Sequence, residues 1–269
     1  MKVVRGAAVA LLLAIALGGL FAPQIALYSP DEQFREFPDA PPSARFPMGT
    51  DDIGRDRFSR LVYGTRISAL LAPAAALCSI VLALLISGLA AAGRWAARGV
   101  AGVTTICLSL PWIFLFIVLR AALPLNAGPA ASVALTFGLM GVAGWAWPAR
   151  VFTASVREIG ESGWLMQARA AGLSRVRIAV AYAWPHLRSL ALAQFRVLIP
   201  AYVLSEASLG LIGLGVPDPL PSWGNLLRDL QHPDVVRANP WVLAPLGLLV
   251  VVMICMEIPG SFASREATL

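Results

Sequence analysis

Few side chains in this 269-residue sequence could take part in catalysis. The two histidines, His186 and His232, each lie beside a proline, and neither belongs to a His-Glu-x-x-His zinc motif. The sequence also lacks the Gly-x-Ser-x-Gly turn that presents a nucleophilic serine. Its single lysine, Lys2, cannot complete a Walker A phosphate loop. We therefore expect no catalytic residue and no metal site, and this argues against an intramembrane hydrolase.

The composition is that of a membrane protein. Hydrophobic residues make up 58% of the chain and charged residues 13%, whereas about a quarter of an ordinary soluble domain is charged. The charges cluster, and the uncharged runs between clusters approach the roughly 20 residues that cross a bilayer as a helix. The net charge of +6 does not indicate a nucleic-acid partner, because basic residues beside membrane spans are the usual orientation signal.

We predict an all-α integral membrane protein with one transmembrane domain, residues 1–269, and about six spans. The predicted spans cover residues 6–28, 67–92, 100–119, 130–148, 189–212 and 241–259. The first could instead be a secretory signal peptide, but no convincing cleavage site follows it. With six spans, both termini lie in the cytoplasm.

Two segments are expected on the outer side of the membrane. Residues 29–66 hold six arginines and seven acids, and residues 213–240 hold two arginines and three aspartates. Asp52 and Arg55 are spaced to pair across one helical turn. Trp223 lies where an outer interface belongs, which fits either anchoring in lipid or docking of an external protein.

The polar stretch 150–188 is expected on the cytoplasmic side, because it holds six arginines against two glutamates. Residues 166–171 favour a helix that Gly172 can end in a left-handed cap. Ser174 can cap a second short helix, which Pro185 ends or kinks. Two short helices broken at a glycine would form a rigid docking element. The alternative is an amphipathic hairpin that lies on anionic lipid.

Small and ionisable residues within the spans indicate further contacts. Gly138 and Gly141 fall three residues apart, so this face is expected to pack against another helix. Arg196 and Glu206 lie within the fifth span, where ionisable residues usually face a bundle interior or a cavity. Both are candidates for the translocation pathway. Arg196 could instead reach the inner surface, and a structural or gate-packing role is favoured for Glu206.

Three stretches resemble the permease subunits of binding-protein-dependent ABC importers, in particular the second permease of the dipeptide, oligopeptide and nickel systems. The first reads Gly49-Thr-Asp-Asp-Ile-Gly-Arg-Asp-Arg-Phe-Ser-Arg-Leu-Val-Tyr-Gly-Thr-Arg-Ile-Ser68, and the second runs from Glu206 to Leu227. The third resembles the family's coupling motif, with Ala168, Gly172 and Pro185 at the motif's spacing. Met166 and Gln167 stand where that motif has Glu and its first Ala.

The resemblance implies an inner-membrane subunit that moves peptides by alternating access, with nickel or another small solute as the alternative cargo. It implies a second homologous permease, cytoplasmic ATPase subunits that use ATP and Mg²⁺, and an external binding protein; no cofactor is expected on this chain. The residues that would contact the ATPase are Met166, Gln167, Ala168, Arg169, Gly172, Leu173 and Pro185. A transporter driven by an ion gradient is the alternative from another class, although internal repeats are not evident.

Overall fold

The long uncharged runs of the sequence form helices in the computed structural model, which describes residues 2–111, 114, 117–118 and 128–266. Within these ranges the regular structure is helical, apart from an isolated bridge between Thr50 and Asp56, so the all-α prediction is confirmed. Five helical stretches of the described residues are long and apolar enough to cross a membrane. They cover Val3–Leu20, Arg57–Ala90, Pro129–Glu161, Ala179–Leu211 and Pro240–Ile258.

The chain divides into two compact units. Unit 1 comprises Met1–Pro73, Arg120–Phe137 and Ile199–Leu269, and unit 2 comprises Ala74–Leu119 and Gly138–Leu198. Helices α3 (Arg57–Ala90), α6 (Pro129–Ala143) and α10 (Trp184–Leu211) contribute residues to both units.

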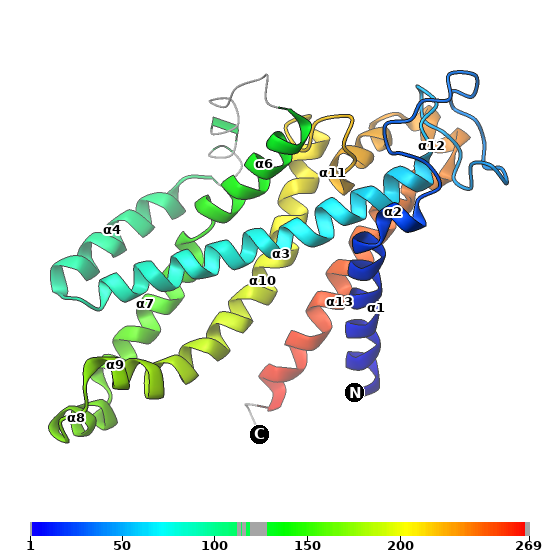
Figure 1. The fold of residues 1–269 in the computed structure, drawn as a ribbon. Helices are drawn as coiled ribbons and strands as arrows, with labels where there is room; N and C mark the ends of the chain where they lie inside the picture. The colour runs from blue at the N-terminus through cyan, green and yellow to red at the C-terminus, as the bar shows by residue number, and fades with distance from the viewer. Residues whose placement is uncertain (1, 112–113, 115–116, 119–127, 267–269) are drawn as a thin grey trace. The chain divides into compact units, whose positions relative to one another are not determined.

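In unit 1, α1 (Lys2–Leu20) lies beside α13 (Ala244–Glu266), and the start of α1 and the end of α13 lie at the same end of the pair (Figure 1). The remaining elements that lie wholly in this unit are short. They are α2 (Ala22–Ile25), α11 (Trp223–Leu226), α12 (Pro233–Ala238), and the 3₁₀ turns Leu227–Gln231 and Pro240–Leu243.

Helix α3 begins at Arg57, whereas the sequence analysis placed the start of the second span near residue 67. The reason is a buried cap. The Asp56 carboxylate accepts the backbone N–H of Ser59 at 2.8 Å, and the side chain of Asp56 is buried. An aspartate at this place satisfies a free N–H group of the first turn. The helix therefore extends into the charged segment that was expected to be an external loop.

The core of unit 1 is built around α11, which is inserted against α3 and α10. Trp223 is fully buried; its backbone N–H donates to Ser68 Oγ at 3.0 Å, and its indole N–H donates to Thr65 Oγ1 at 3.1 Å. Glu206, also fully buried, accepts from Ser68 Oγ at 3.0 Å and from the backbone N–H of Gly224 at 3.3 Å. Trp223 therefore packs inside this chain. It is neither a lipid anchor nor a docking residue, so both predictions made for it from the sequence are wrong.

The close approach of α10 and α11 depends on glycine. A Cβ on Gly210 would lie 2.2 Å from the carbonyl carbon of Gly224, and a Cβ on Gly224 would lie 2.5 Å from the Glu206 carbonyl oxygen. Both obstacles are backbone atoms, which cannot move aside as a flexible side chain can. Any larger residue at either position must therefore separate the two helices.

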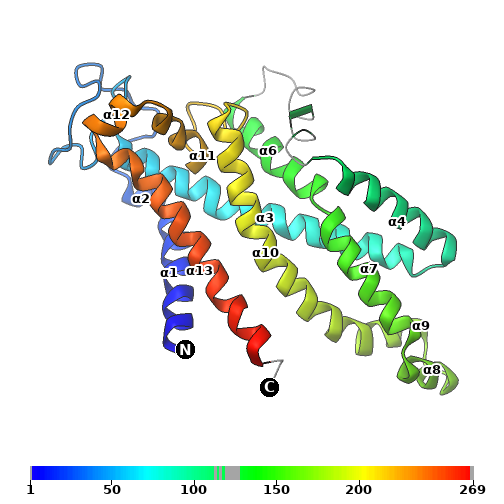
Figure 2. The same cartoon turned by 180° about the vertical axis from the view of Figure 1, so that it is seen from behind.

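Unit 2 contains the rest of α3 and α10, with α4 (Arg94–Ser109), α7 (Ala146–Glu161) and the short helices described below. Helix α4 lies along α7 (Figure 2). The predicted third span, 100–119, continues beyond α4 into residues outside the described ones. Of the predicted packing face, Gly141 makes a close contact, because a Cβ there would lie 2.9 Å from Cys78 Cβ, and Ser79 Oγ donates to the Gly141 carbonyl at 2.6 Å. A Cβ on Gly138 would meet nothing within 4 Å, so the prediction is wrong for that position.

We predict that Gly224→Ala destabilises the protein by about 1–3 kcal/mol, because the added methyl overlaps the backbone of α10. The measurement is the thermal melting midpoint of the purified protein in detergent. The control is Gly247→Ala in α13, where a Cβ would meet nothing within 4 Å. That change should be neutral or mildly stabilising, because alanine is favoured over glycine within a helix. Equal losses in both variants would contradict the packing described for α11.

Candidate functional site

The polar stretch predicted to couple the chain to a partner forms a helical hairpin in unit 2, the α8–α9 hairpin (residues 163–178). Helix α8 (Gly163–Ala170) ends where Gly172 adopts a φ of +77°, and the N–H of Leu173 donates to the Ala168 carbonyl at 3.1 Å. This six-to-one hydrogen bond across a left-handed glycine is a Schellman cap. The left-handed cap predicted at Gly172 is thus present.

A small apolar core, to which Ile159 at the end of α7 also contributes, holds the α8–α9 hairpin together. Leu165, Ala168 and Ile178 are buried together, and Leu173 packs against them. Leu173 is the residue after the cap glycine, so its contact with Ala168 completes the usual apolar contact of the Schellman motif. The ring of Trp164, in α8, stacks on that of Tyr182, which follows α9, with their centroids 5.6 Å apart.

The second helix begins as the sequence predicts. Ser174 Oγ accepts the N–H of Arg177 at 3.3 Å and caps α9 (Arg175–Ile178). Pro185 does not end this helical course. The chain passes through the π-helical turn Ala179–Ala183 into α10, and Pro185 is the second residue of α10. Because proline has no N–H group, Pro185 cannot donate a helical hydrogen bond, and the wider π turn lies directly before this break in the hydrogen-bond pattern.

The predicted coupling residues divide between surface and interior. Met166 is 65% exposed, and Gln167 and Pro185 are also exposed, whereas Ala168 is buried. Leu173 is half-buried, and Gly172 has open space around it. The Arg169 side chain lies outside the described part of the structure. The hairpin therefore presents Met166 and Gln167 outward.

The aromatic stack between Trp164 and Tyr182 was not predicted. Both rings are partly exposed, at 41% and 46%, and they join the start of α8 to the π turn. The residues lie 18 positions apart, so no helical or strand periodicity links them in the sequence. The turn at Gly172, which reverses the chain between them, was the only available signal.

The two ionisable residues predicted in the fifth span have different surroundings. Arg196, in the unit 2 part of α10, is exposed on this chain, and no ion pair among the described residues includes it. Glu206, in the unit 1 part, has no exposed surface and lies under α11. In this structure the carboxyl of Glu206 is thus enclosed by protein on every side.

Four charged residues of unit 1 form an ion cluster: Asp51, Arg55, Arg60 and Asp218. Arg55 Nε lies 2.6 Å from Asp51, and Arg55 and Arg60 each place a guanidinium nitrogen 3.0 Å from Asp218 Oδ1. Arg55 therefore pairs with Asp51 and Asp218, and the pairing predicted with Asp52 is wrong. The cluster links the segment before α3 to the loop before α11, two parts far apart in the sequence.

The ion cluster shifts the pKa values of Asp218 and Arg55. Burial alone would raise the pKa of the Asp218 carboxyl, but the hydrogen bonds and positive charge of Arg60 and Arg55 hold that pKa below its usual value. Burial likewise opposes the charge of Arg55, yet Asp51 and Asp218 raise the pKa of its guanidinium. Both groups therefore remain charged at neutral pH.

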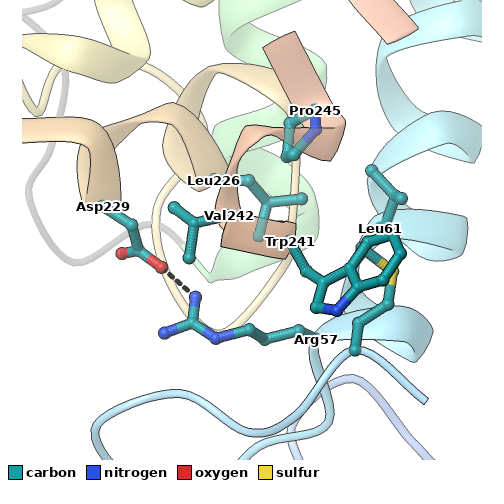
Figure 3. A pocket seen from close by; sticks show the side chains of 8 residues that line it. Arg57, Leu61, Leu226, Asp229, Trp241, Val242 and Pro245 are labelled. Atoms are coloured by element: carbon teal, nitrogen blue, oxygen red, sulfur yellow. Dashed lines mark hydrogen bonds and ion pairs between the residues drawn. The ribbon is translucent and has the colours of Figure 1, made fainter. Parts of the chain in front are cut away.

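A second ion pair, Arg57 with Asp229, borders a small pocket that is also lined by Leu61, Trp241 and Val242. Figure 3 shows the Arg57 guanidinium pointing toward Asp229, with the indole of Trp241 beside Leu61. The free space, about 20 Å³, is room for water and not for a peptide. This pocket is therefore a packing feature of unit 1 and no cargo site.

Apolar helices long enough to span a bilayer, with a short helical hairpin between two of them, are typical of a multi-pass membrane protein. Residues 65–262 match the family described as "binding-protein-dependent transport system inner membrane component", and the chain belongs to this family. It is a multi-pass protein of the inner membrane.

Known relatives extend over most of the chain. The di/tripeptide transport system permease protein DppC of Pseudomonas aeruginosa is 31% identical and aligns with 90% of this chain and 80% of its own length. The oligopeptide transport system permease protein OppC of Bacillus subtilis is 28% identical, over 91% of this chain and 79% of its own. A solved chain of the MetNI methionine ABC transporter, in an inward-facing conformation, has a TM-score of 0.58 at 19% identity, covering 78% of this chain and 96% of that one. This last similarity shows a shared fold.

We predict that Asp218→Asn lowers the thermal melting midpoint at neutral pH. The folded-state pKa of Asp218 lies below the ordinary value of 3.8, so the ion cluster contributes its full stability above that value and loses it as the pH falls further. The difference between wild type and variant should therefore shrink below pH 3.8. Because the carboxyl is half-exposed, the difference should also shrink in high salt.

The control for this experiment is Asp234→Asn. It removes the same charge from an exposed position that no ion pair among the described residues uses. A midpoint difference for Asp218→Asn that stays constant between pH 7 and pH 3 would contradict the assignment of the ion cluster.

Proposed function

We propose that this chain is a permease subunit of an ATP-driven importer that carries dipeptides and oligopeptides across the inner membrane. The observation that carries the proposal is the similarity over about nine-tenths of the chain to permeases named for di/tripeptide and oligopeptide transport. Because the subunit's task is a change of conformation, none of its residues needs to be catalytic.

We further propose that the α8–α9 hairpin docks onto a cytoplasmic ATPase, which binds ATP and Mg²⁺. The hairpin is suited to this role because the apolar core that it shares with the end of α7, together with its Schellman cap, stabilises its shape within this chain. It presents Met166 and Gln167 outward on α8. A preformed element loses little conformational freedom on docking and transmits movement as a rigid body.

The proposed topology places both termini in the cytoplasm, a second homologous permease beside this one, and a binding protein on the outer side. The start of α1 and the end of α13 lie at the same end of unit 1, which supports the proposal that both termini are on one side of the membrane (Figure 1). The segment between α7 and α10 is basic, and this supports a cytoplasmic location for the hairpin, because basic loops are retained in the cytoplasm.

Uptake measurements in proteoliposomes test the transport function. The purified complex should accumulate a labelled dipeptide only when ATP is enclosed with the ATPase and the binding protein is supplied outside. A proton uncoupler should leave this uptake unchanged. Uptake that needs no ATP and is abolished by the uncoupler would instead identify an ion-driven transporter, and uptake of Ni²⁺ without peptide would identify the alternative cargo.

We predict that Gly172→Pro abolishes ATP-driven uptake while the subunit remains in the membrane. Proline fixes φ near −65°, whereas this position needs +77°, so the Schellman cap cannot form. The control is Gly172→Asn, because asparagine tolerates the left-handed region and a Cβ at this position would meet nothing within 4 Å. The asparagine variant should retain most of the uptake. Unchanged uptake in the proline variant would count against the coupling role.

We also propose that Arg196 faces the translocation pathway and attracts the carboxylate of the cargo. The support is its exposed position on α10, where no ion pair among the described residues includes it. Arg196→Ala should then lower the rate of uptake or change peptide selectivity at least about fivefold, while Arg196→Lys retains most of the activity through its charge. A loss of protein abundance in the alanine variant, with normal uptake per complex, would show that Arg196 is structural.

A further inference from the structure

The first turn of α4 carries an exposed tryptophan with two arginine side chains close to its ring. Trp95 is 71% exposed, and the guanidinium carbons of Arg94 and Arg98 lie 5.2 Å and 5.1 Å from its ring centroid. These distances fit cation–π contacts. We call Arg94, Trp95 and Arg98 the Arg–Trp–Arg turn. Its two positive charges are thus fixed near one another at the surface of unit 2.

No carboxylate pairs with these arginines among the described residues. The sequence contains no aspartate or glutamate between Asp56 and Glu158. Among the described residues, the ion pairs involve Arg55, Arg57, Arg60 and Arg157, and neither Arg94 nor Arg98. Two cations beside one ring repel each other, so an anion from outside the chain would stabilise the arrangement.

An apolar stripe of α4 continues directly from this turn. Val103 and Ile106 are 51% and 66% exposed, and they follow Trp95 by eight and eleven residues, which places them within about 80° of it around the helix. Thr104, nine residues after Trp95 and on the opposite side, is buried, and α4 packs along α7 (Figure 2). The stripe is therefore the face of α4 that points away from the other helices of unit 2.

We propose that the Arg–Trp–Arg turn binds the headgroup of an anionic phospholipid whose acyl chains lie along the apolar stripe of α4. A guanidinium group donates paired hydrogen bonds to phosphate oxygens, and indole rings favour the boundary between lipid and water. The positive charges lie at the start of α4, and the apolar surface lies further along the same face. These two regions match the headgroup and the acyl chains of a phospholipid. A soluble phosphate would use the arginines but leave the stripe uncovered.

The test is lipid binding to the intact complex in nanodiscs, with phosphatidylglycerol titrated into phosphatidylcholine and bound lipid counted by native mass spectrometry. The wild-type complex should retain phosphatidylglycerol selectively. Arg94→Gln with Arg98→Gln should weaken the tightest site by roughly 25-fold, at about fivefold for each arginine near a membrane surface. The lysine pair, Arg94→Lys with Arg98→Lys, should bind with intermediate affinity and reports on the site if the glutamine pair does not assemble.

The control pair is Arg35→Gln with Arg228→Gln, which removes the same charge from exposed positions outside α4. This pair should leave the tightest site unchanged. Equal phosphatidylglycerol binding by the glutamine pair and the wild type would overturn the proposal. So would retention of phosphatidylcholine as tight as that of phosphatidylglycerol, displacement of the lipid by inorganic phosphate alone, or a second permease found covering Trp95.

Discussion

The hydrogen bonds that Ser68 and Glu206 make to the first turn of α11 are the contacts on which unit 1 depends. A short helix has few internal hydrogen bonds, and its first N–H groups have no partner within the helix. Buried among apolar helices, such groups are costly unless other side chains accept from them. Ser68 Oγ accepts from Trp223, and the Glu206 carboxyl accepts from Gly224. The fully buried Trp223 can then fill the space beside α3.

Hydrogen bonding and apolar packing also shape the α8–α9 hairpin, which is more exposed than α11. Its chain reversal is stabilised by a hydrogen bond from Leu173 to Ala168 and by a small apolar core, so its shape does not depend on a partner. What remains for a partner is the outward surface around Met166. In the proposed function, a separately folded hairpin of this kind allows an ATPase outside the membrane to act on helices within it.

Much of this architecture could be predicted, because it depends on local rules. Uncharged runs indicated the helices, Gly172 indicated the left-handed cap, and Ser174 indicated the start of α9. Contacts between distant segments could not be predicted. The pairing of Arg55 with Asp218 joins residues 163 positions apart, so the sequence suggested the nearby Asp52 instead. Trp223 was predicted to lie at an interface, because the residues that contact it in the interior, Ser68 and Thr65, lie about 155 positions away in the sequence.

The most direct test of the account is to purify this subunit from its own membranes in a gentle detergent, with a photo-reactive amino acid at position 166. The account predicts that ATPase subunits and a second permease purify with it, and that light joins position 166 to the ATPase. A homo-oligomer without any ATPase, found repeatedly in still milder detergents, would contradict it. Co-purification with crosslinks only to lipid would instead retain the complex but remove the α8–α9 hairpin from the contact.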